Sequence, residues 1–165
     1  MLRDYVLERE IGRGGMAVVW LARHSTTRLP VAIKFVRAVP NKPHLLKSFE
    51  TEVQAVARLN HRGIARVIDT GSVTEEIPEL PHVQVGHPYL ITEFVGGGTL
   101  DEYVGRLDWQ QSKSLLLSVL EALAHAHARG ITHRDLKPSN ILVSTDDDQF
   151  VPKIADFGIA RLHSE

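Results

Sequence analysis

The most informative stretch of the sequence reads His133-Arg134-Asp135-Leu136-Lys137-Pro138-Ser139-Asn140. It follows Gly130, a typical stop after an apolar helix, and precedes the short apolar run 141–143. One loop therefore supplies a carboxylate from Asp135, a cation from Lys137 and a neutral oxygen ligand from Asn140. A merely polar loop is the simpler alternative, but it would not need all three groups. We expect this loop to carry chemistry.

A second polar group follows a predicted strand, and a glycine-rich turn lies near the N-terminus. Asp156-Phe157-Gly158 comes directly after the strand residues Ile154-Ala155, although this tripeptide alone is common. Residues 11–19 place Gly12, Gly14 and Gly15 between two predicted strands. Glycines let backbone N–H groups approach phosphate oxygens, but a plain hairpin turn would look the same. A strand follows the glycines, which disfavours a dinucleotide-binding fold.

Lys34 ends the run Val31-Ala32-Ile33-Lys34, so one cation lies on an otherwise apolar strand. An exposed strand lysine is the simple alternative. A helix is predicted over residues 44–59, and at 100° per residue Glu52 lies on its inward stripe while Glu50 points away. The apolar members of that stripe are Phe49, Val53, Val56 and Leu59. A carboxylate on a buried face needs a partner, and Lys34 is the obvious one.

The order of predicted elements indicates an α+β protein with two parts. Short strands are predicted at 5–7, extending toward Ile11, and at 18–22, 31–36, 67–68 and 89–91. Residues 74–88 contain three prolines and are predicted to be an irregular, exposed surface insertion. Gly96-Gly97-Gly98 is predicted to be a hinge, so we expect domains at 1–95 and 96–165.

The second part is predicted to be mainly helical. Thr99 with Glu102 has capping-box spacing and should open a short helix. Asp108 with Gln111 should open a longer one that runs to Arg129. We expect its wide apolar face to be buried; that face comprises Leu115, Leu116, Leu117, Val119, Leu120, Leu123 and Ala126. Two short strands are predicted at 141–143 and 151–154.

Composition excludes several classes of protein. The chain has 165 residues, 43% hydrophobic and 24% charged, with a net charge of -1, as in ordinary soluble proteins. Its Lys and Arg residues are scattered, so we expect no nucleic-acid or anionic-membrane surface. No run approaches the roughly 20 apolar residues of a membrane span. The absence of Cys fits a reducing compartment, and we expect a cytoplasmic location, with an anchor in a longer parent protein left open.

The motifs occur in an order that resembles the eukaryotic-like, Hanks-type protein kinase family. The ordered set is the glycine-rich turn, Val-Ala-Ile-Lys, the helix glutamate, His-Arg-Asp with Asn140, and Asp-Phe-Gly. Residues 135–140 resemble serine/threonine kinases rather than tyrosine kinases. Gly14-Gly15-Met16 and Leu59-Asn60-His61 resemble the bacterial branch. The resemblance implies a protein-kinase-like fold, with an antiparallel-sheet N-lobe carrying one helix and the start of a helical C-lobe.

The resemblance also implies ATP-dependent transfer of the γ-phosphate to Ser or Thr hydroxyls of a protein substrate. Asp135 would accept the hydroxyl proton, Lys137 would steady the γ-phosphate, and Glu52 would position Lys34. Asn140 and Asp156 would bind Mg²⁺, which prefers oxygen ligands. The implied ATP-binding residues are Ile11, Gly12, Arg13, Gly14, Gly15, Met16, Ala17, Val19, Ala32, Lys34, Glu93, Val95 and Leu142. Ala17 stands where the family pattern has its third glycine.

Only residues 159–165 follow Asp156-Phe157-Gly158, so the family's activation loop and later helices lie outside this sequence. We therefore expect the chain alone to bind ATP but to transfer phosphate poorly. Two alternatives stay open: a regulatory, pseudokinase-like nucleotide-binding module, and a truncated product without a stable fold. The presence of Lys34, Asp135, Asn140 and Asp156 together favours an enzyme over the regulatory module. The oligomeric state and the protein substrate are not predicted.

Overall fold

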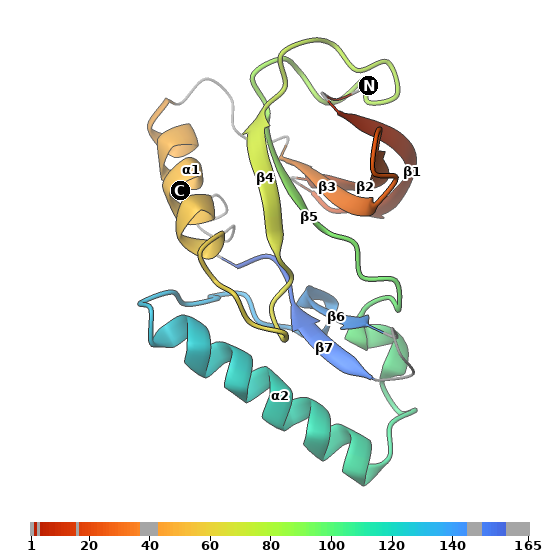
Figure 1. Ribbon diagram of the computed structural model, residues 1–165, viewed down its shortest axis with the longest axis vertical. Helices are drawn as coiled ribbons and strands as arrows, with labels where there is room; N and C mark the ends of the chain where they lie inside the picture. The colour runs from red at the N-terminus through yellow and green to blue at the C-terminus, as the bar shows by residue number, and fades with distance from the viewer. Residues whose placement is uncertain (1, 3, 16, 37–42, 145–149, 158–165) are drawn as a thin grey trace. The chain divides into compact units, whose positions relative to one another are not determined.

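The computed structural model describes residues 2, 4–15, 17–36, 43–144 and 150–157 (Figure 1). The chain forms two compact units, the first from Met1–Val53 and Val67–Phe94 and the second from Gln54–Arg66 and Val95–Glu165. The division into 1–95 and 96–165 stays a prediction, and the structure groups residues 54–66 with the second unit.

The first unit is built on a five-stranded antiparallel sheet (Figure 1). The strand order is β1-β2-β3-β5-β4. The bounds are β1 Tyr5–Arg13, β2 Ala17–His24, β3 Pro30–Val36, β4 Val67–Ser72 and β5 Pro88–Glu93. All five strands were predicted from short apolar runs, and each is longer than its run. The predicted α+β, kinase-like antiparallel sheet is confirmed.

One face of this sheet forms the apolar core of the first unit. Side chains alternate between faces along a strand, so every second residue points inward. The inward set is Val18, Ala22, Val31, Ile33, Phe35, Tyr89 and Ile91, all buried in one cluster. The Phe35 and Tyr89 rings lie 6.2 Å apart between centroids. The opposite face carries Lys34.

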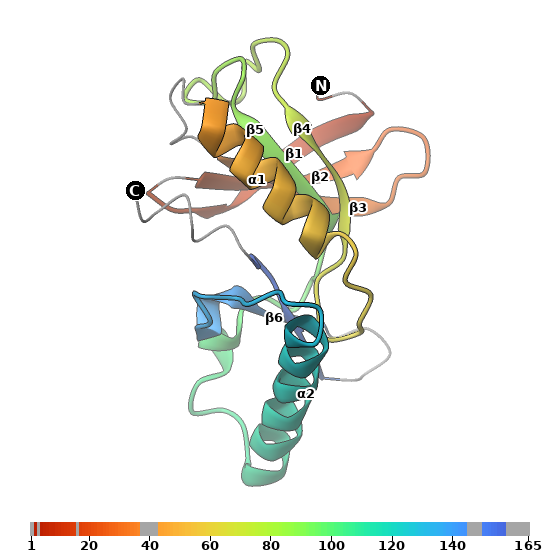
Figure 2. The ribbon, with the colours of Figure 1, turned by 90° about the vertical axis from the view of Figure 1, so that its left-hand side faces the viewer.

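Helix α1 spans Pro43–Val56, three residues short of the predicted end at Leu59. Figures 1 and 2 show it running beside the sheet at β4 and β5. Phe49, Val53 and Val56 are buried, as their spacing predicts. Beyond Val56 the backbone tightens, because Leu59 N donates to Val56 O at 2.9 Å in an i→i+3 bond. Such bonds commonly finish a helix in place of another α turn.

The segment 73–87, which connects β4 and β5, corrects one prediction. It is irregular, as expected, but four of its apolar side chains are buried rather than exposed. Val73, Ile77, Leu80 and Val83 are each no more than 4% exposed and belong to the core cluster of the sheet. The prolines indicated the irregular backbone correctly, whereas the apolar residues at every third or fourth position carried the burial signal. We call this segment the β4–β5 insertion.

The second unit contains α2 (Trp109–His127), two short 3₁₀ turns and a hairpin. The 3₁₀ turns are η1 (Leu100–Tyr103), where a short helix was predicted, and η2 (Pro138–Asn140). The hairpin pairs β6 (Ile141–Ser144) with β7 (Val151–Ile154). Asp108 caps α2 as predicted: its side chain accepts from Gln111 N at 2.8 Å, and Asp108 N donates to the Gln111 amide oxygen at 3.0 Å. Gly130, with φ +73°, follows the helix end.

Residues 63–65 join the second unit through backbone bonds to β7. Ala65 N donates to Ile154 O at 2.9 Å, and Ile154 N donates to Gly63 O at 2.8 Å. A Cβ at Gly63 would lie 3.1 Å from the Cβ of Ala122 on α2. The glycine therefore allows this segment to pass close to the helix, which explains why residues 54–66 belong to this unit.

The buried face of α2 differs from the predicted one. Val119, Ala122 and Ala126 are buried, and the helix packs along β7 (Figure 1). Leu116, Leu117 and Leu120 are 57%, 52% and 51% exposed, so the described residues cover only part of the apolar face, and its burial by the family's later helices stays a prediction. The leucines extend around the helix beyond the stripe that contacts β7, and a periodicity argument cannot tell which side of so wide a face is covered.

His125 on α2 gives the second unit a predicted pH dependence. Its ring lies 5.0 Å from that of His61, and its Nε2 is buried without a hydrogen-bond partner among the described residues. Burial, followed by the charge of Arg129 and the nearness of His61, lowers the pKa of His125 below its usual 6.5. The folded unit therefore favours the neutral ring, and this contribution to stability is present above about pH 6.5 and is lost as the pH falls toward the lowered pKa.

We expect the melting temperature of the wild-type chain to fall more than that of His125→Gln when the pH is lowered from about 7.5 to about 5.5. Thermal unfolding followed by circular dichroism at both pH values measures the difference. His127→Gln is the control, because His127 is exposed on the same helix and its replacement should leave the wild-type pH response unchanged. Equal responses of the wild type and His125→Gln would contradict the assignment.

Candidate active site

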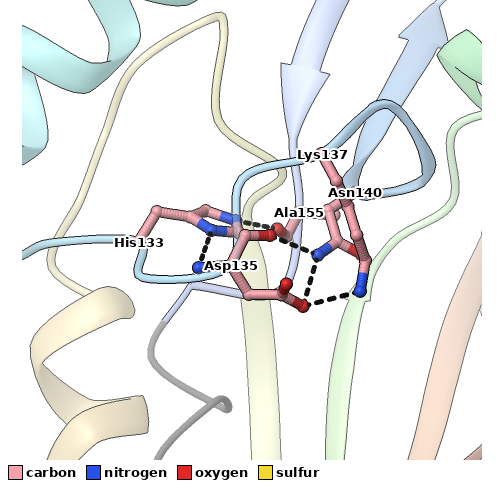
Figure 3. Close-up of polar contacts among 5 residues, drawn as sticks. All are labelled: His133, Asp135, Lys137, Asn140 and Ala155. Atoms are coloured by element: carbon pink, nitrogen blue, oxygen red, sulfur yellow. Dashed lines mark hydrogen bonds and ion pairs between the residues drawn. The ribbon is translucent and has the colours of Figure 1, made fainter.

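Three polar side chains of the predicted catalytic loop meet in the second unit (Figure 3). Lys137 Nζ lies 2.8 Å from Asp135 Oδ2. The Asn140 side-chain amide donates to the Asp135 backbone oxygen at 2.7 Å and to Asp135 Oδ2 at 3.2 Å. Asn140 is buried, whereas the Asp135 side chain is 49% exposed. The loop therefore presents a fixed carboxylate that remains accessible from solvent.

His133 anchors this loop to the strand that precedes Asp156. Its ring is 3% exposed, and Nε2 lies 2.7 Å from the backbone oxygen of Ala155. Asp135 N donates to His133 Nδ1 at 3.3 Å, so the ring carries its proton on Nε2 and donates to Ala155 O. Phe157 packs edge-on against the ring, with centroids 4.8 Å apart. His133 thus links the loop to residues 155–157.

The surroundings of Asp135 keep its carboxyl group ionised. The hydrogen bond from Lys137 is the largest effect and lowers the pKa of Asp135 below its usual value, and the bond from Asn140 acts in the same direction. Partial burial opposes both. At neutral pH the group is therefore a carboxylate with one oxygen held by Lys137 and Asn140, and it can accept a hydrogen bond from a hydroxyl group.

The β6–β7 hairpin brings Asn140 and Asp156 to the same end of two paired strands. Ile141 pairs with Ile154 in the register, and Ala155 N donates to Asn140 O at 2.9 Å. Asp156 follows immediately, with φ +63°, a conformation that is uncommon for a residue with a side chain. Arg134, with φ +68°, is a second such residue in this site. Positive φ at non-glycine residues is concentrated in functional sites.

Residues 97–99 lie against β6 in the same unit. Gly97 N donates to Val143 O and Val143 N donates to Gly98 O, both at 2.9 Å, and Thr99 forms a bridge to Leu142. Gly98 has φ +81°, which glycine adopts at little cost. Leu142 is half-buried on β6, and Val95 is buried. The predicted hinge glycines are therefore held by the hairpin that carries the predicted adenine contact Leu142.

In the first unit, the sheet places several predicted nucleotide contacts on one face. Val19 lies opposite Lys34 in the register, and Leu21 lies opposite Ala32. Directly opposed residues of an antiparallel pair point to the same side. Val19, Ala32 and Lys34 therefore share the face opposite to the Phe35 core, and all three are half-buried. Ile11, on β1, is also half-buried.

The glycine-rich turn connects β1 and β2. Gly14 N donates to Ala17 O at 2.9 Å, and Gly12 lies opposite Val19. Gly14 and Gly15 are exposed, and no heavy atom lies within 4 Å of a Cβ built at Gly15. The Arg13 guanidinium binds the Glu10 carboxylate, with Nε 2.7 Å from Oε1. Met16 and Gly158 lie outside the described residues.

Glu52 and Glu93 complete the predicted set in the first unit. Glu52 is half-buried on α1, between the buried Phe49 and Val56. Its pairing with Lys34 stays a prediction. Glu93 is the last residue of β5 and pairs with Val31. Sequence reasoning missed the anchoring by His133, whose only local signal was its place directly before Arg134-Asp135.

The sequence of the chain matches the family described as protein kinase domain over residues 5–165. The chain belongs to the protein kinase family. Among the curated relatives of this kinase sequence is the probable serine/threonine-protein kinase PknB of Bifidobacterium longum, 39% identical over 95% of the chain. Serine/threonine-protein kinase Pkn1 of Myxococcus xanthus is 39% identical over 96%, and PknB of Mycobacterium leprae is 37% identical over 95%.

The kinase chain spans less than a quarter of the length of these relatives: 23%, 22% and 24% of the respective proteins. All three are bacterial, in agreement with the resemblance of residues 14–16 and 59–61 to the bacterial branch. Within the described part of the kinase chain, no helix has the length and apolar character needed to cross a membrane.

Proposed function

We propose that this kinase chain serves ATP-dependent phosphorylation of serine or threonine hydroxyls on a protein substrate. The observation that carries the proposal is the ionised Asp135 carboxylate, accessible from solvent and held at one oxygen by Lys137 and Asn140. Phosphoryl transfer needs positioning and charge neutralisation more than covalent chemistry. A fixed carboxylate next to a cation and an amide provides both for an incoming hydroxyl group.

The second unit would position the acceptor and the transferred group. Asp135 orients the substrate hydroxyl through a hydrogen bond and takes its proton. Lys137, 2.8 Å from Asp135, neutralises negative charge on the transferred phosphoryl group. His133 keeps the loop in place through Ala155 O, so that Asp135 does not have to be ordered when the substrate arrives.

The first unit would bind the nucleotide. The backbone of the glycine-rich turn, residues 12–15 and 17, covers its phosphate oxygens. Ala17, which is still small, stands where the family has its third glycine. Lys34 neutralises phosphate charge from the face that it shares with Val19 and Ala32, and those two side chains pack on the adenine ring. The role of Glu52 is to position Lys34.

The donor atoms at the end of the hairpin fit Mg²⁺. Asn140 and Asp156 offer one amide oxygen and one carboxylate from adjacent paired strands, and Mg²⁺ is commonly held by one or two protein oxygens together with phosphate and water. When bound, the ion neutralises the charge of the ATP phosphates. The positive φ of Asp156, two residues after the end of β7, fixes the direction in which its carboxylate leaves the backbone.

A regulatory, pseudokinase-like module is the alternative function. It would bind the nucleotide without using Asp135 as a base. Incubation of the protein with ATP, Mg²⁺ and a mixture of basic proteins, followed by mass spectrometry, distinguishes the two. Phosphoserine or phosphothreonine that forms only with ATP and the divalent ion supports the kinase. Nucleotide binding without any phosphoryl transfer, in a protein extended beyond residue 165, would favour the regulatory module.

The partner in this proposal is a protein that carries an accessible Ser or Thr. A cytoplasmic location, where ATP and Mg²⁺ are present, is part of the proposal and rests on the cysteine-free composition. We predict separately that the 165 residues alone transfer phosphate only weakly.

A further inference from the structure

The β4–β5 insertion is a structural part of the first unit rather than a loose connection. Its four inward residues, Val73, Ile77, Leu80 and Val83, fill the core beside Phe35 and Tyr89. The remaining residues of the segment must therefore face outward from a fixed backbone.

Hydrogen bonds close this backbone on itself. Val73 N donates to His87 O at 2.9 Å, and Gly86 N donates to Val73 O at 2.8 Å. Leu80 N donates to Ile77 O and Val83 N donates to Leu80 O, both at 2.8 Å. Gly86 accepts the required φ of +91°. A surface on such a framework is preorganised, so a ligand does not have to order it on binding.

The outward side of the insertion contains an open groove of about 690 Å³ with both apolar and polar surface. It is lined by Glu76, Ile77, Pro78, Leu80, Pro81, Val83, Gln84 and Val85. Val85 is 57% exposed, and Pro78 and Pro81 are also exposed. The groove therefore offers aliphatic surface to solvent along one edge while its floor is the buried core of the unit.

One border of the groove is acidic: Glu76 lines it, and Glu75 and Glu79 lie next to lining residues in the sequence, although Glu79 also lines a smaller hollow that contains Arg13. Glu75, Glu76 and Glu79 are all exposed, and segment 73–87 contains no Lys or Arg. None of the three carboxylates forms an ion pair with another described residue. Three nearby negative charges beside this groove attract cationic groups and repel a second acidic surface.

We propose that this groove is a docking site for an extended segment of another protein that carries Arg or Lys beside aliphatic residues. Aliphatic side chains of the segment contact Val85, Pro78 and Pro81, and its cations pair with the glutamates. The groove is too open to enclose a small molecule. Two copies of this chain would bring two acidic borders together, which disfavours self-association through this face. The proposal is independent of catalysis and goes beyond the proposed function.

The test measures the fluorescence anisotropy of a fluorescein-labelled peptide of alternating Arg and Leu on titration with the chain. The matched peptide alternates Glu and Leu. We expect Glu76→Lys with Glu79→Lys to raise the Kd of the Arg/Leu peptide about tenfold, and Val85→Asp to raise it by a similar factor. Added salt should weaken binding to the wild type and have less effect on the double variant.

Two control variants match these substitutions on exposed sites elsewhere. Glu50→Lys with Glu121→Lys makes the same change in net charge, and Val104→Asp replaces a valine that is 71% exposed; both should leave the Kd within about twofold. The proposal would be overturned if the control variants lost as much binding as the groove variants. It would also be overturned if the Glu/Leu peptide bound as tightly as the Arg/Leu peptide, or if the Arg/Leu peptide did not bind. Self-association abolished by Val85→Asp would also overturn it, because the occupant would then be a second copy.

Discussion

Replacing Asp135 by Asn should lower kcat for phosphoryl transfer by about 10²–10⁴-fold, the range associated with loss of a general base. Asn has nearly the same shape, and its amide oxygen still accepts a hydrogen bond from Lys137, so the loop geometry is retained. The amide cannot take a proton from the substrate hydroxyl. Asp135 is proposed to act on the substrate hydroxyl and not on ATP. The KM for ATP should therefore change by no more than about twofold.

Steady-state kinetics on an active preparation with a serine- or threonine-containing peptide measures this effect. Asp101→Asn is the matched control, since Asp101 is exposed in η1 and outside the catalytic loop, and its rate should be unchanged. Retention of near-wild-type kcat by Asp135→Asn would show that this carboxylate is not the base.

Replacing Phe35 by Ala should destabilise the first unit by about 3–5 kcal/mol. The Phe35 side chain is fully buried, at 0% exposure, and contacts the similarly buried Tyr89. Its neighbours lie in a sheet paired on both sides of β3, which limits how far the structure can collapse into the space left behind. A change of this size is a large fraction of the stability of a typical domain.

Chemical denaturation followed by fluorescence or circular dichroism measures the loss as a lower midpoint at constant slope. Leu29→Ala is the control, because Leu29 is 63% exposed and its truncation should cost within about 0.5 kcal/mol. A loss below about 1 kcal/mol for Phe35→Ala would contradict the packing described for this core.

Local sequence signals predicted the elements that depend on neighbouring residues. The cap of α2 at Asp108 and Gln111, its end before Gly130, and the five strands of the sheet were all predicted. The loop 133–140 was found because its chemistry is concentrated in eight consecutive residues. In such cases the residues that interact are close in the chain, so spacing alone carries the information.

Features that depend on distant packing could not be predicted in the same way. Which side of the leucine-rich α2 is covered depends on β7 and residues 63–65, which approach from elsewhere in the chain. Ile77 and Leu80 are buried because they pack into the core of the five-stranded sheet, whose strands come from other parts of the sequence. The anchoring of His133 by Ala155 needs the β6–β7 hairpin, whose register a short apolar run does not determine.

The most direct test of the account is thermal unfolding of the chain with and without Mg-ATP, with Asp156→Asn as the paired variant. At about 100 times its Kd, the ligand should stabilise the folded chain by roughly 2.7 kcal/mol. We expect a cooperative transition that moves to higher temperature with Mg-ATP, and a smaller shift in Asp156→Asn. A cooperative transition that Mg-ATP leaves unchanged, or an equal shift in the variant, would contradict the assignment of a metal–nucleotide site to Asn140 and Asp156.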